Sequence, residues 1–442
     1  MGLKLRLFVL IQNKKFIYLF YKKTNMKLEE INHWWTEKRV KQEFVPPIRR
    51  DLFNTIKKEL YRRQIQIIVG LRRTGKSTIF YQLIDEMIKE GINPLNIVYC
   101  SFDEPELQGK RIEEILKEYS KLTNVNYKEE KIFLFLDEAQ KSENWVADVK
   151  LIYDNLRNIK IFVSGSASLN ILSEAKKSLA GRAIYYELKP LSFNEFLNLK
   201  GIKVEKERFL LYRDILEREF DFFLLRPFPE IVNEKDINFI KSYIRSSIIE
   251  PIILKDIPKE FGGVDVLLLE KLVEIFMSNP GQYLRIDELA KELKRSKITL
   301  YKALFYLEFS FLVRKIMNYR PSIRVASRKL TRIYAYHPAL TLPFNVQEEK
   351  FAENLVLFEL NAKYYWREKE KEINFLTDFA PIEVKLKSKI GKEDVRWLLY
   401  FMKKYGKKLG FKKAYLITRD LEGKENNIIL LPIWKFCFKG LD

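Results

Sequence analysis

The segment 70–78, GLRRTGKST, has the residue types and spacing of a phosphate-binding loop. Glycines at 70 and 75 let the backbone turn tightly, so that several N–H groups face an anion at the start of the next helix. In this pattern the amine of Lys76 reaches the β and γ phosphates, and the hydroxyl of Ser77 ligates Mg²⁺. The predicted nucleotide-binding residues are Gly70, Leu71, Arg72, Arg73, Thr74, Gly75, Lys76, Ser77 and Thr78.

Two carboxylates end an apolar run in the sequence IFLFLDE, residues 132–138. Five apolar residues before two acids indicate a buried strand that delivers the acids to the carboxyl edge of a parallel sheet, where such sheets bind ligands. There Asp137 would hold Mg²⁺ through water, and Glu138 would polarise the attacking water as a general base. Having both acids favours a hydrolytic enzyme over a passive binder.

Serines and an arginine follow in the next two runs. Of the three serines in VSGSAS, Ser164, Ser166 and Ser168, the first is the best candidate to hydrogen-bond the attacking water or the γ-phosphate, as the sensor residue of AAA-like ATPases does. Arg182 precedes the following strand, and three roles stay open for it. It could stabilise transition-state charge in cis, reach a neighbouring subunit, or lie exposed on the surface.

Short apolar runs alternate with amphipathic helical stretches between residues 46 and 190. The runs are residues 64–70, 96–102, 131–137, 159–165 and 183–188. Strands that alternate with helices predict an α/β fold, a mostly parallel sheet covered on both faces.

The order of these motifs resembles the archaeal AAA-type ATPase family, which occurs in archaea and bacteria. The resemblance covers residues 49–420. It is carried by GLRRTGKST, SFDEP (101–105), FLDEAQ (135–140), SGSAS, and AGR followed by LKPLSFNEF (188–196). It implies an AAA/ASCE-like P-loop NTPase domain with ATP as the nucleotide, a winged helix, and a restriction-endonuclease-like C-terminal domain.

The composition changes divide the chain into five predicted regions. They are an N-terminal extension of unknown role (1–45), the P-loop domain (46–190), a helical lid or connector (191–279), the winged helix (280–342) and the nuclease-like domain (343–442). The first 25 residues contain two apolar runs, each shorter than a membrane helix. A signal sequence, an added hairpin or an early start site are the alternatives there.

The sequence IDELAKELKRSKITLYKALFYL predicts a helix-turn-helix. We expect Asp287 and Ser296 to cap its helices, and Lys297, Thr299 and Lys302 to face a DNA major groove. A wing over 312–336 would present cations to phosphates. These cations are Arg314, Lys315, Arg320, Arg324, Arg328, Lys329 and Arg332. The alternative is a dimerisation or packing module that uses Phe305 and Tyr306.

The C-terminal region carries an incomplete version of the metal site that the resemblance implies. Glu353 lies on its first predicted helix, and Glu383 with Lys385 forms the Glu-x-Lys half. Asn374 stands where the pattern has aspartate, and its neutral amide binds Mg²⁺ less strongly than a carboxylate. Asp378 is in the presumed turn. We therefore predict a vestigial nuclease site on a retained scaffold.

The bulk composition favours an anionic partner. The chain has 80 Lys and Arg against 59 Asp and Glu, for a formal net charge of +21. Such a charge favours nucleic acid or an acidic membrane face, although a Lys-rich thermophile proteome is an alternative. Two cysteines and two histidines argue against a disulfide framework or a zinc site. We expect a cytoplasmic protein without a membrane role, and a homo-oligomer remains open.

These observations predict a Mg²⁺-dependent ATPase coupled to a DNA-binding C-terminal half, with other nucleic acids open. One alternative is an ATP-gated switch that binds a protein partner. The other is a nuclease that the ATPase regulates.

Overall fold

The computed structural model describes residues 27–142, 144–165, 175–319 and 330–441. Several predicted site residues therefore lie outside the described residues. They are Ser166, Ser168, Arg320, Arg324, Arg328 and Lys329. Within the described ranges, no helix is long and apolar enough to cross a membrane.

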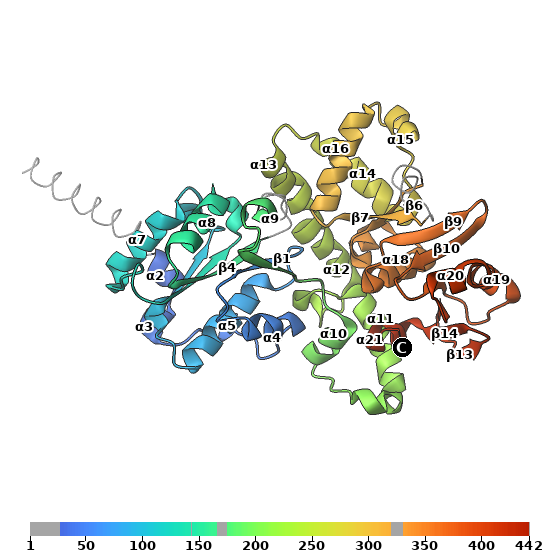
Figure 1. The fold of residues 1–442 in the computed structure, drawn as a ribbon, viewed down its shortest axis with the longest axis horizontal. Coiled ribbons are helices and arrows are strands. Elements are labelled where there is room, and N and C mark those ends of the chain that lie inside the picture. The colour runs from blue at the N-terminus through green and yellow to red at the C-terminus, as the bar shows by residue number, and fades with distance from the viewer. Residues whose placement is uncertain (1–26, 143, 166–174, 320–329, 442) are drawn as a thin grey trace, which may run out of the picture. The chain divides into compact units, whose positions relative to one another are not determined.

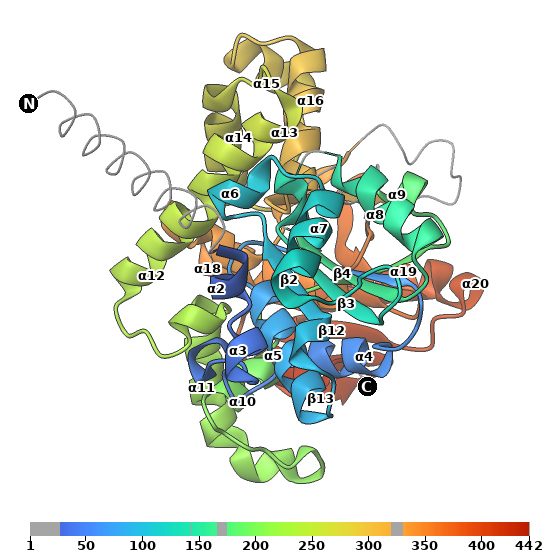
Figure 2. The same cartoon turned by 90° about the vertical axis from the view of Figure 1, so that its left-hand side faces the viewer.

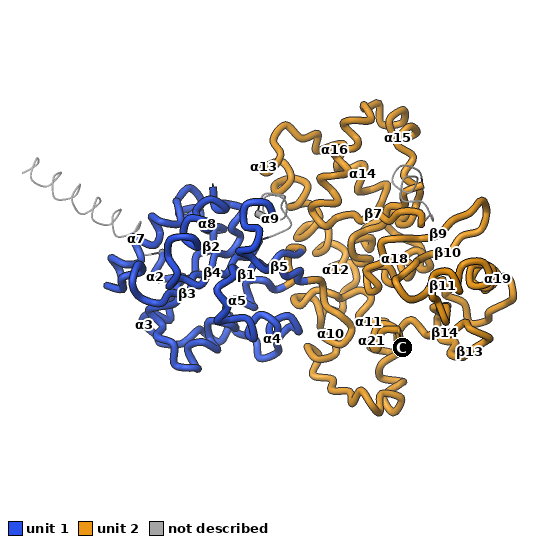
Figure 3. The backbone as a smooth tube through the Cα atoms, viewed as in Figure 1, with its two compact units in different colours: residues 1–70, 75–188 blue, residues 71–74, 189–442 orange. Residues whose placement is uncertain are grey.

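The chain divides into two compact units (Figure 3). Unit 1 comprises residues 1–70 and 75–188, and unit 2 comprises residues 71–74 and 189–442. The division after residue 188 lies close to the predicted end of the P-loop domain at residue 190. The four residues 71–74 come from the predicted phosphate loop but pack with unit 2.

Unit 1 is built on a parallel sheet with strand order β2-β3-β4-β1-β5 (Figure 1). Its strands are β1 (Ile65–Val69), β2 (Ile97–Ser101), β3 (Ile132–Asp137), β4 (Ile159–Gly165) and β5 (Ala183–Glu187). Each strand lies inside one of the predicted apolar runs, so the α/β prediction with its parallel sheet is confirmed. Because β4 lies between β1 and β3, the carboxyl ends of these three strands are neighbours.

Helices pack on the sheet of unit 1 in two groups (Figures 1 and 2). Helix α5 (Lys76–Lys89) packs with α4 (Asp51–Lys58), and α7 (Ile112–Thr123) packs with α8 (Trp145–Asn155). Right-handed crossovers place α5 on the face opposite α7 and α8, because the chain moves along the sheet in opposite directions in the two cases. The remaining helices are α2 (Lys27–Ile31), α3 (Trp34–Glu37), α6 (Pro105–Gln108) and α9 (Ala175–Ser178).

The described residues before residue 46 include a segment, 32–35, that covers the edge strand β2. Asn32 exchanges two hydrogen bonds with the backbone of Tyr99, at 2.7 and 2.9 Å. The indole N–H groups of Trp34 and Trp35 donate to the carbonyl of Ile97 at 3.1 and 2.8 Å. Side chains thus satisfy backbone groups that an edge strand would otherwise expose. The described part of the predicted extension is therefore a structural part of unit 1.

Unit 2 begins with helices and ends in a mixed α/β region. Its first helices are α10 (Phe193–Leu199), α11 (Arg213–Leu225), α12 (Ile237–Ile244), the π-helical turns η7 (Arg245–Ile249) and η8 (Ile252–Asp256), α13 (Ile257–Phe261) and α14 (Val266–Ser278). The later helices are α15 (Ile286–Glu292), α16 (Lys297–Phe309), α18 (Glu348–Leu360), α19 (Lys392–Phe401), α20 (Lys407–Leu409) and α21 (Ile433–Lys439).

Among the residues that the structure describes, the strands of unit 2 join into one nine-stranded sheet of order β13-β14-β12-β11-β10-β9-β7-β8-β6. The strands are β6 (Gln282–Tyr283), β7 (Val313–Asn318), β8 (Arg332–Ala335), β9 (Tyr364–Glu368), β10 (Lys371–Leu376), β11 (Pro381–Lys385), β12 (Ala414–Thr418), β13 (Gly423–Glu425) and β14 (Ile428–Pro432). The predicted boundary between residues 342 and 343 therefore falls within a shared sheet.

A single short junction joins the two parts of this sheet. Strand β7 pairs antiparallel with β8 and parallel with β9, where Met317 lies opposite Tyr364. The buried Asn318 side chain donates to the carbonyl of Arg367 at 3.1 Å and accepts from its N–H at 2.8 Å. Asn318 thus extends the backbone pairing beyond the regular ladder.

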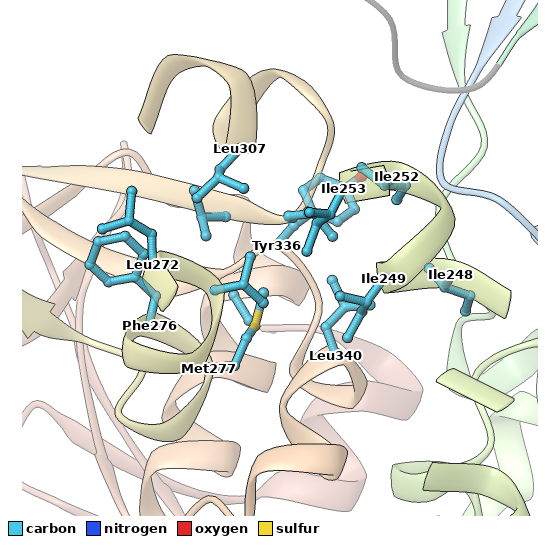
Figure 4. Close-up of a cluster of buried hydrophobic side chains, with 14 of the residues drawn as sticks. Ile248, Ile249, Ile252, Ile253, Leu272, Phe276, Met277, Leu307, Tyr336 and Leu340 are labelled. Carbon is cyan, nitrogen blue, oxygen red and sulfur yellow. The ribbon is translucent and has the colours of Figure 1, made fainter. Parts of the chain in front are cut away.

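The helices and first strands of unit 2 enclose an apolar cluster (Figure 4). Figure 4 shows side chains of η7, η8, α14 and α16 gathered in it, with Tyr336 and Leu340 beside them. Fully buried members include Leu269, Leu272 and Leu300. Continuous apolar contact of this kind holds the predicted lid and winged-helix regions together as parts of one unit.

Candidate nucleotide-binding site

The loop between β1 and α5 needs glycine at residue 70 because another backbone passes close to it. A Cβ atom built on Gly70 would lie 2.3 Å from the carbonyl oxygen of Leu188. The same Leu188 donates its N–H to the carbonyl of Val69 at 2.7 Å. Gly75 has φ +94°, in the region that favours glycine. These two positions explain the predicted glycine spacing.

The start of α5 offers a suitable place for an anion. Helix α5 begins at Lys76 and has no acidic residue in its first turn. Its unpaired N–H groups and dipole favour negative charge there. The Lys76 side chain is buried, and its Nζ donates to the carbonyl of Gly70 at 3.2 Å. Lys76, predicted to bind phosphate, therefore folds back onto its own loop.

Asp137 is the centre of the polar network at the carboxyl edge of the sheet. Its Oδ2 accepts hydrogen bonds from the Ser77 hydroxyl at 2.5 Å and from the Tyr99 hydroxyl at 2.7 Å. Its Oδ1 accepts one from the Ser164 hydroxyl. The carboxylate is only 2% exposed. The structure thus brings together three predicted site residues from the starts or ends of three different elements.

Tyr99 belongs to this network and is not among the residues that the sequence predicted. It lies within the apolar run of β2, whose only polar signal was the terminal Ser101. Burial and the charge of Asp137 raise the pKa of Tyr99 well above its usual value. The phenol therefore keeps its proton and donates a hydrogen bond to Asp137. Only the pairing of β2 with β3 reveals this contact.

Glu138, the predicted general base, follows directly after β3. Its backbone has φ +52°, an uncommon conformation for glutamate. Its N–H donates to Asp137 Oδ1 at 3.1 Å, and its Oε2 accepts a hydrogen bond from the Gln140 side-chain amide at 2.6 Å. Gln140 was not predicted, because an amide two residues away has no periodic signal. It holds the carboxylate that the sequence indicated as the base.

Arg182 lies at the opposite edge of the sheet from the phosphate loop. Its carbonyl accepts from the N–H of Ile65 at the start of β1, at 2.8 Å, whereas the loop follows the end of that strand. Its Nε donates to Asp154 of α8 at 2.8 Å. The length of β1, at about 3.3 Å per residue, separates it from the phosphates. The predicted role in cis is therefore wrong, and a role across subunits remains a prediction.

The helix predicted to read DNA has a mixed exposed face. Ser296 caps α16 as predicted, since its hydroxyl accepts from the N–H of Thr299 at 3.1 Å. Asp287 does not cap α15; it pairs with Lys297 instead. Lys302 is exposed. Three large apolar residues on the same helix are also exposed: Ile298 (70%), Tyr301 (58%) and Phe305 (44%).

Three of the predicted wing cations have partners within the protein. Arg332 is buried and pairs with two glutamates. Arg314 donates to the Asn361 side chain at 2.7 Å, and Lys315 pairs with Glu308 at 2.6 Å. The prediction that Arg332 contacts phosphate is wrong, because the side chain is inaccessible. Charge alone could not distinguish this internal counter-ion from a surface cation.

The four residues of the predicted vestigial nuclease site do come together in unit 2. Glu383 Oε2 accepts from the backbone N–H of Asn374 at 3.1 Å, and Glu383 Oε1 pairs with Lys385 at 3.1 Å. The Asn374 amide oxygen accepts from the N–H of Val384 at 2.9 Å. Burial raises the pKa of Glu383 to about 7, and nearby Glu353 adds to this effect.

Arg332 occupies a central place beside these acids. It pairs with Glu353 at 3.0 Å and with Glu372 at 2.9 Å, and the Tyr334 hydroxyl donates to the same Glu353 oxygen at 2.6 Å. An arginine on two carboxylates supplies the positive charge that a metal would otherwise supply. Among the residues that the structure describes, no three His, Cys, Asp or Glu side chains gather as metal ligands.

Two sequence families match this chain. Residues 62–197 match the family described as an AAA domain, and residues 199–344 match a domain of unknown function. The first match covers the phosphate loop, both acids and the whole sheet of unit 1. Together with the geometry, it supports an AAA-type P-loop ATPase domain in this part of the chain.

Relatives occur in archaea and bacteria. An uncharacterized protein of Methanocaldococcus jannaschii is 27% identical over 72% of this chain and 73% of its own length. A second protein of that organism is 30% identical over 58% of each chain. A Haemophilus influenzae protein is 28% identical over 58% of this chain and 62% of its own. The chain thus spans only about three fifths of the last two relatives.

Solved structures give weaker likenesses. The structure of C. elegans PCH-2 is 14% identical with a TM-score of 0.26, over 63% of this chain and 71% of that chain. AMPPCP-bound DnaA from Aquifex aeolicus is 17% identical with a TM-score of 0.26, over 58% and 86%. Similarities at this level carry no argument about function.

Proposed function

We propose that this protein is a Mg²⁺-dependent ATPase whose hydrolysis cycle acts on a DNA-binding C-terminal half. The observation that carries the ATPase part is the Asp137 network, in which a buried carboxylate shares hydrogen bonds with the loop serine Ser77 and with Ser164. At the carboxyl edge of a parallel sheet, an acid beside a loop hydroxyl is the arrangement that P-loop enzymes use for phosphoryl transfer.

The oxygen atoms of Ser77 and Asp137 suit a hard cation such as Mg²⁺. Three of the hydrogen bonds to Asp137 come from hydroxyl groups, and a hydroxyl can rotate its proton away. When bound, Mg²⁺ would neutralise charge on the β and γ phosphates. Lys76 would leave the Gly70 carbonyl to bind phosphate, and the backbone N–H groups at the start of α5 would orient the anion.

Glu138 would orient and polarise the attacking water, and it would accept the proton that the water loses. Its hydrogen bond from Gln140 fixes one carboxylate oxygen, which leaves the other for water. Ser164 donates to Asp137 and lies 3.4 Å from the Glu138 N–H. It is therefore placed to keep the two acids in fixed relation.

ATP hydrolysis by purified Lys76→Ala and Glu138→Gln variants tests this proposal. We expect both to lose activity, whereas the matched surface variants Lys117→Ala and Glu113→Gln should keep it. Lys117 and Glu113 form an exposed ion pair on α7. Full hydrolysis by Lys76→Ala and Glu138→Gln would show that the assigned site is wrong.

DNA binding by unit 2 is supported by the net charge of +21 and by the helix-turn-helix-like order of α15 and α16 before the antiparallel strands β7 and β8. We infer a winged helix that uses Lys302 and the wing cations of residues 320–329. Neutralising Arg324, Arg328 and Lys329 should weaken duplex binding and reduce its salt dependence. Unchanged binding and salt slope would exclude the wing as the DNA surface.

The second candidate is an ATP-gated switch that binds a protein partner. The exposed apolar residues Ile298, Tyr301 and Phe305 favour it, because a DNA-reading helix usually presents polar side chains to the groove. ATPase rates measured with duplex, branched and single-stranded DNA, with RNA and without nucleic acid separate the two. Stimulation by DNA supports the first candidate, and DNA-independent turnover with a co-purifying protein supports the second.

We propose that the C-terminal region does not cleave nucleic acid. Asn374 uses its amide oxygen within the sheet, and Arg332 and Lys385 already balance the acids. Incubating the protein with plasmid DNA and Mg²⁺ or Mn²⁺ should therefore give no cleavage. Metal-dependent cleavage that Lys385→Ala abolishes would overturn this proposal and favour an ATPase-regulated nuclease.

A further inference from the structure

The tip of the phosphate loop has an apolar anchor in unit 2. Residues 71–74 pack with unit 2, whereas Gly70 and Gly75 on either side pack with unit 1. Leu71 is 1% exposed and is a member of the apolar cluster that the helices of unit 2 enclose. The Thr74 hydroxyl donates to the Leu71 carbonyl at 2.9 Å and closes the turn. The loop tip is therefore fixed by hydrophobic burial.

Arg72 adds a directional contact beside this anchor. Its Nε donates to Asp256 Oδ2 at 2.7 Å, and its Nη2 donates to Oδ1 of the same carboxylate. The two side chains are only 25% and 16% exposed. A two-pronged pair between a planar guanidinium and a carboxylate fixes orientation as well as distance.

Arg73 makes a looser contact with the same unit. It has φ +65° and donates to both oxygens of Glu230 at 3.0 and 3.2 Å. Glu230 also accepts from the Tyr243 hydroxyl at 3.1 Å. Both members of this ion pair are about half exposed, so its energy is small. Arg72 is therefore the stronger of the two connections.

Asp256 ends an unusual stretch of helix. The π-helical turns η7 and η8 flank Pro251, which has no N–H to donate within a helix. π-Helical turns are rare and occur often at functional sites. Asp256 is the last residue of η8, so a change in that turn would move the carboxylate that holds Arg72.

We propose that Arg72 and Asp256 form a positioning pair that couples the phosphate loop to the helices of unit 2. The inference rests on the proposed ATPase function. A nucleotide drawn to the loop N–H groups changes the loop, and Arg72 passes that change to η8. By thermodynamic linkage, a partner that binds unit 2 and shifts η8 changes the affinity of the loop for nucleotide by the same factor.

Hydrogen exchange on the full-length protein tests this coupling directly. We expect a non-hydrolysable ATP analogue with Mg²⁺ to change amide exchange in residues 245–257 of the wild type. Arg72→Ala and Asp256→Asn should abolish that change. They should also raise the KM for ATP about 5- to 10-fold, near the lower end of typical coupling between sites. The charge-swapped double variant Arg72→Asp/Asp256→Arg should recover part of both effects.

The control variant is Arg245→Ala, which removes an exposed ion pair with Glu250 on the same stretch of helix. It should leave the nucleotide-dependent exchange and the KM unchanged. Wild-type exchange behaviour in Asp256→Asn, which keeps the size of the side chain, would overturn the coupling. A wild-type protein that hydrolyses no ATP would instead contradict the proposed function, so the two failures are distinguishable.

Discussion

Asp137 in unit 1 and Glu353 in unit 2 are both buried carboxylates beside a sheet, but different groups donate to them. Asp137 receives hydrogen bonds from the hydroxyls of Ser77, Tyr99 and Ser164. Glu353 receives them from Arg332 and the Tyr334 hydroxyl. The hydroxyl donors to the first acid are neutral, whereas a guanidinium neutralises the second. The acid in unit 1 is therefore ready for a cation, and the one in unit 2 already has a cation.

The largest effect should come from removing the charge of Asp137. Asp137→Asn should lower the rate of ATP hydrolysis about 10³-fold, within the range for loss of a group that stabilises transition-state charge. Glu353→Gln, the equivalent change in unit 2, should leave the rate within about twofold. Steady-state ATPase assays on both variants measure this. Equal losses of ATPase rate in the two variants would contradict the proposed difference between Asp137 and Glu353.

Removing Arg332, the cation beside Glu353, should instead lower the stability of the fold. Arg332→Ala leaves Glu353 and Glu372 without their counter-ion and should lower the free energy of unfolding by about 3 kcal/mol. Lys315→Ala, which breaks a pair on the neighbouring strand whose side chains are about one-third exposed, should cost less than about 1 kcal/mol. Urea denaturation of the two variants gives the comparison. Similar losses would mean that burial of Arg332 is unimportant.

The pH should affect stability through Glu383, which lies beside Glu353 in unit 2. Burial raises the pKa of Glu383 from 4.5 to about 7, so the folded protein keeps this proton over a range in which the unfolded chain loses it. The contribution of Glu383 to stability is full below about pH 4.5 and is lost as the pH rises to 7. Denaturation at several pH values should show Glu383→Gln gaining about 3 kcal/mol over wild type across this window. A constant difference would contradict the assignment.

The smallest effect concerns the unpredicted member of the Asp137 network. Tyr99→Phe removes one of three hydroxyl donors and should cost about 1 kcal/mol of stability, because Ser77 and Ser164 still satisfy the carboxylate. Its effect on ATP hydrolysis should stay below about tenfold. Tyr119→Phe is a useful control, since that buried hydroxyl donates to the Leu95 carbonyl away from the site. A larger loss of activity than of stability would give Tyr99 a direct role.

Local patterns predicted the sheet of unit 1 and the residues at its carboxyl edge. Five apolar runs became the five strands, and the spacing of loop and acids placed Ser77 beside Asp137. Tyr99 and Gln140 were missed, because a contact across strands or within a left-handed turn leaves no period in the sequence. Arg182 was misplaced because adjacency to a strand does not say which end of the sheet it occupies.

Charges were the least predictable feature of unit 2. The sequence predicted Arg332 as a cation of the wing, but the side chain is buried and pairs with Glu353 and Glu372. The partner of a charged side chain depends on sheet pairing, and the sequence shows only the charge. The same limit applied to Arg72, whose carboxylate partner lies 184 positions away along the chain.

The pairing of β7 with β9 has a practical consequence for anyone who divides this chain. The match to the domain of unknown function ends at residue 344, while the sheet of that region continues through residues 364–368. Cutting there would expose one unpaired strand edge on each fragment, and such edges join with other chains. The two fragments should therefore aggregate when produced separately and regain order when co-expressed, so they are best treated as one structural module.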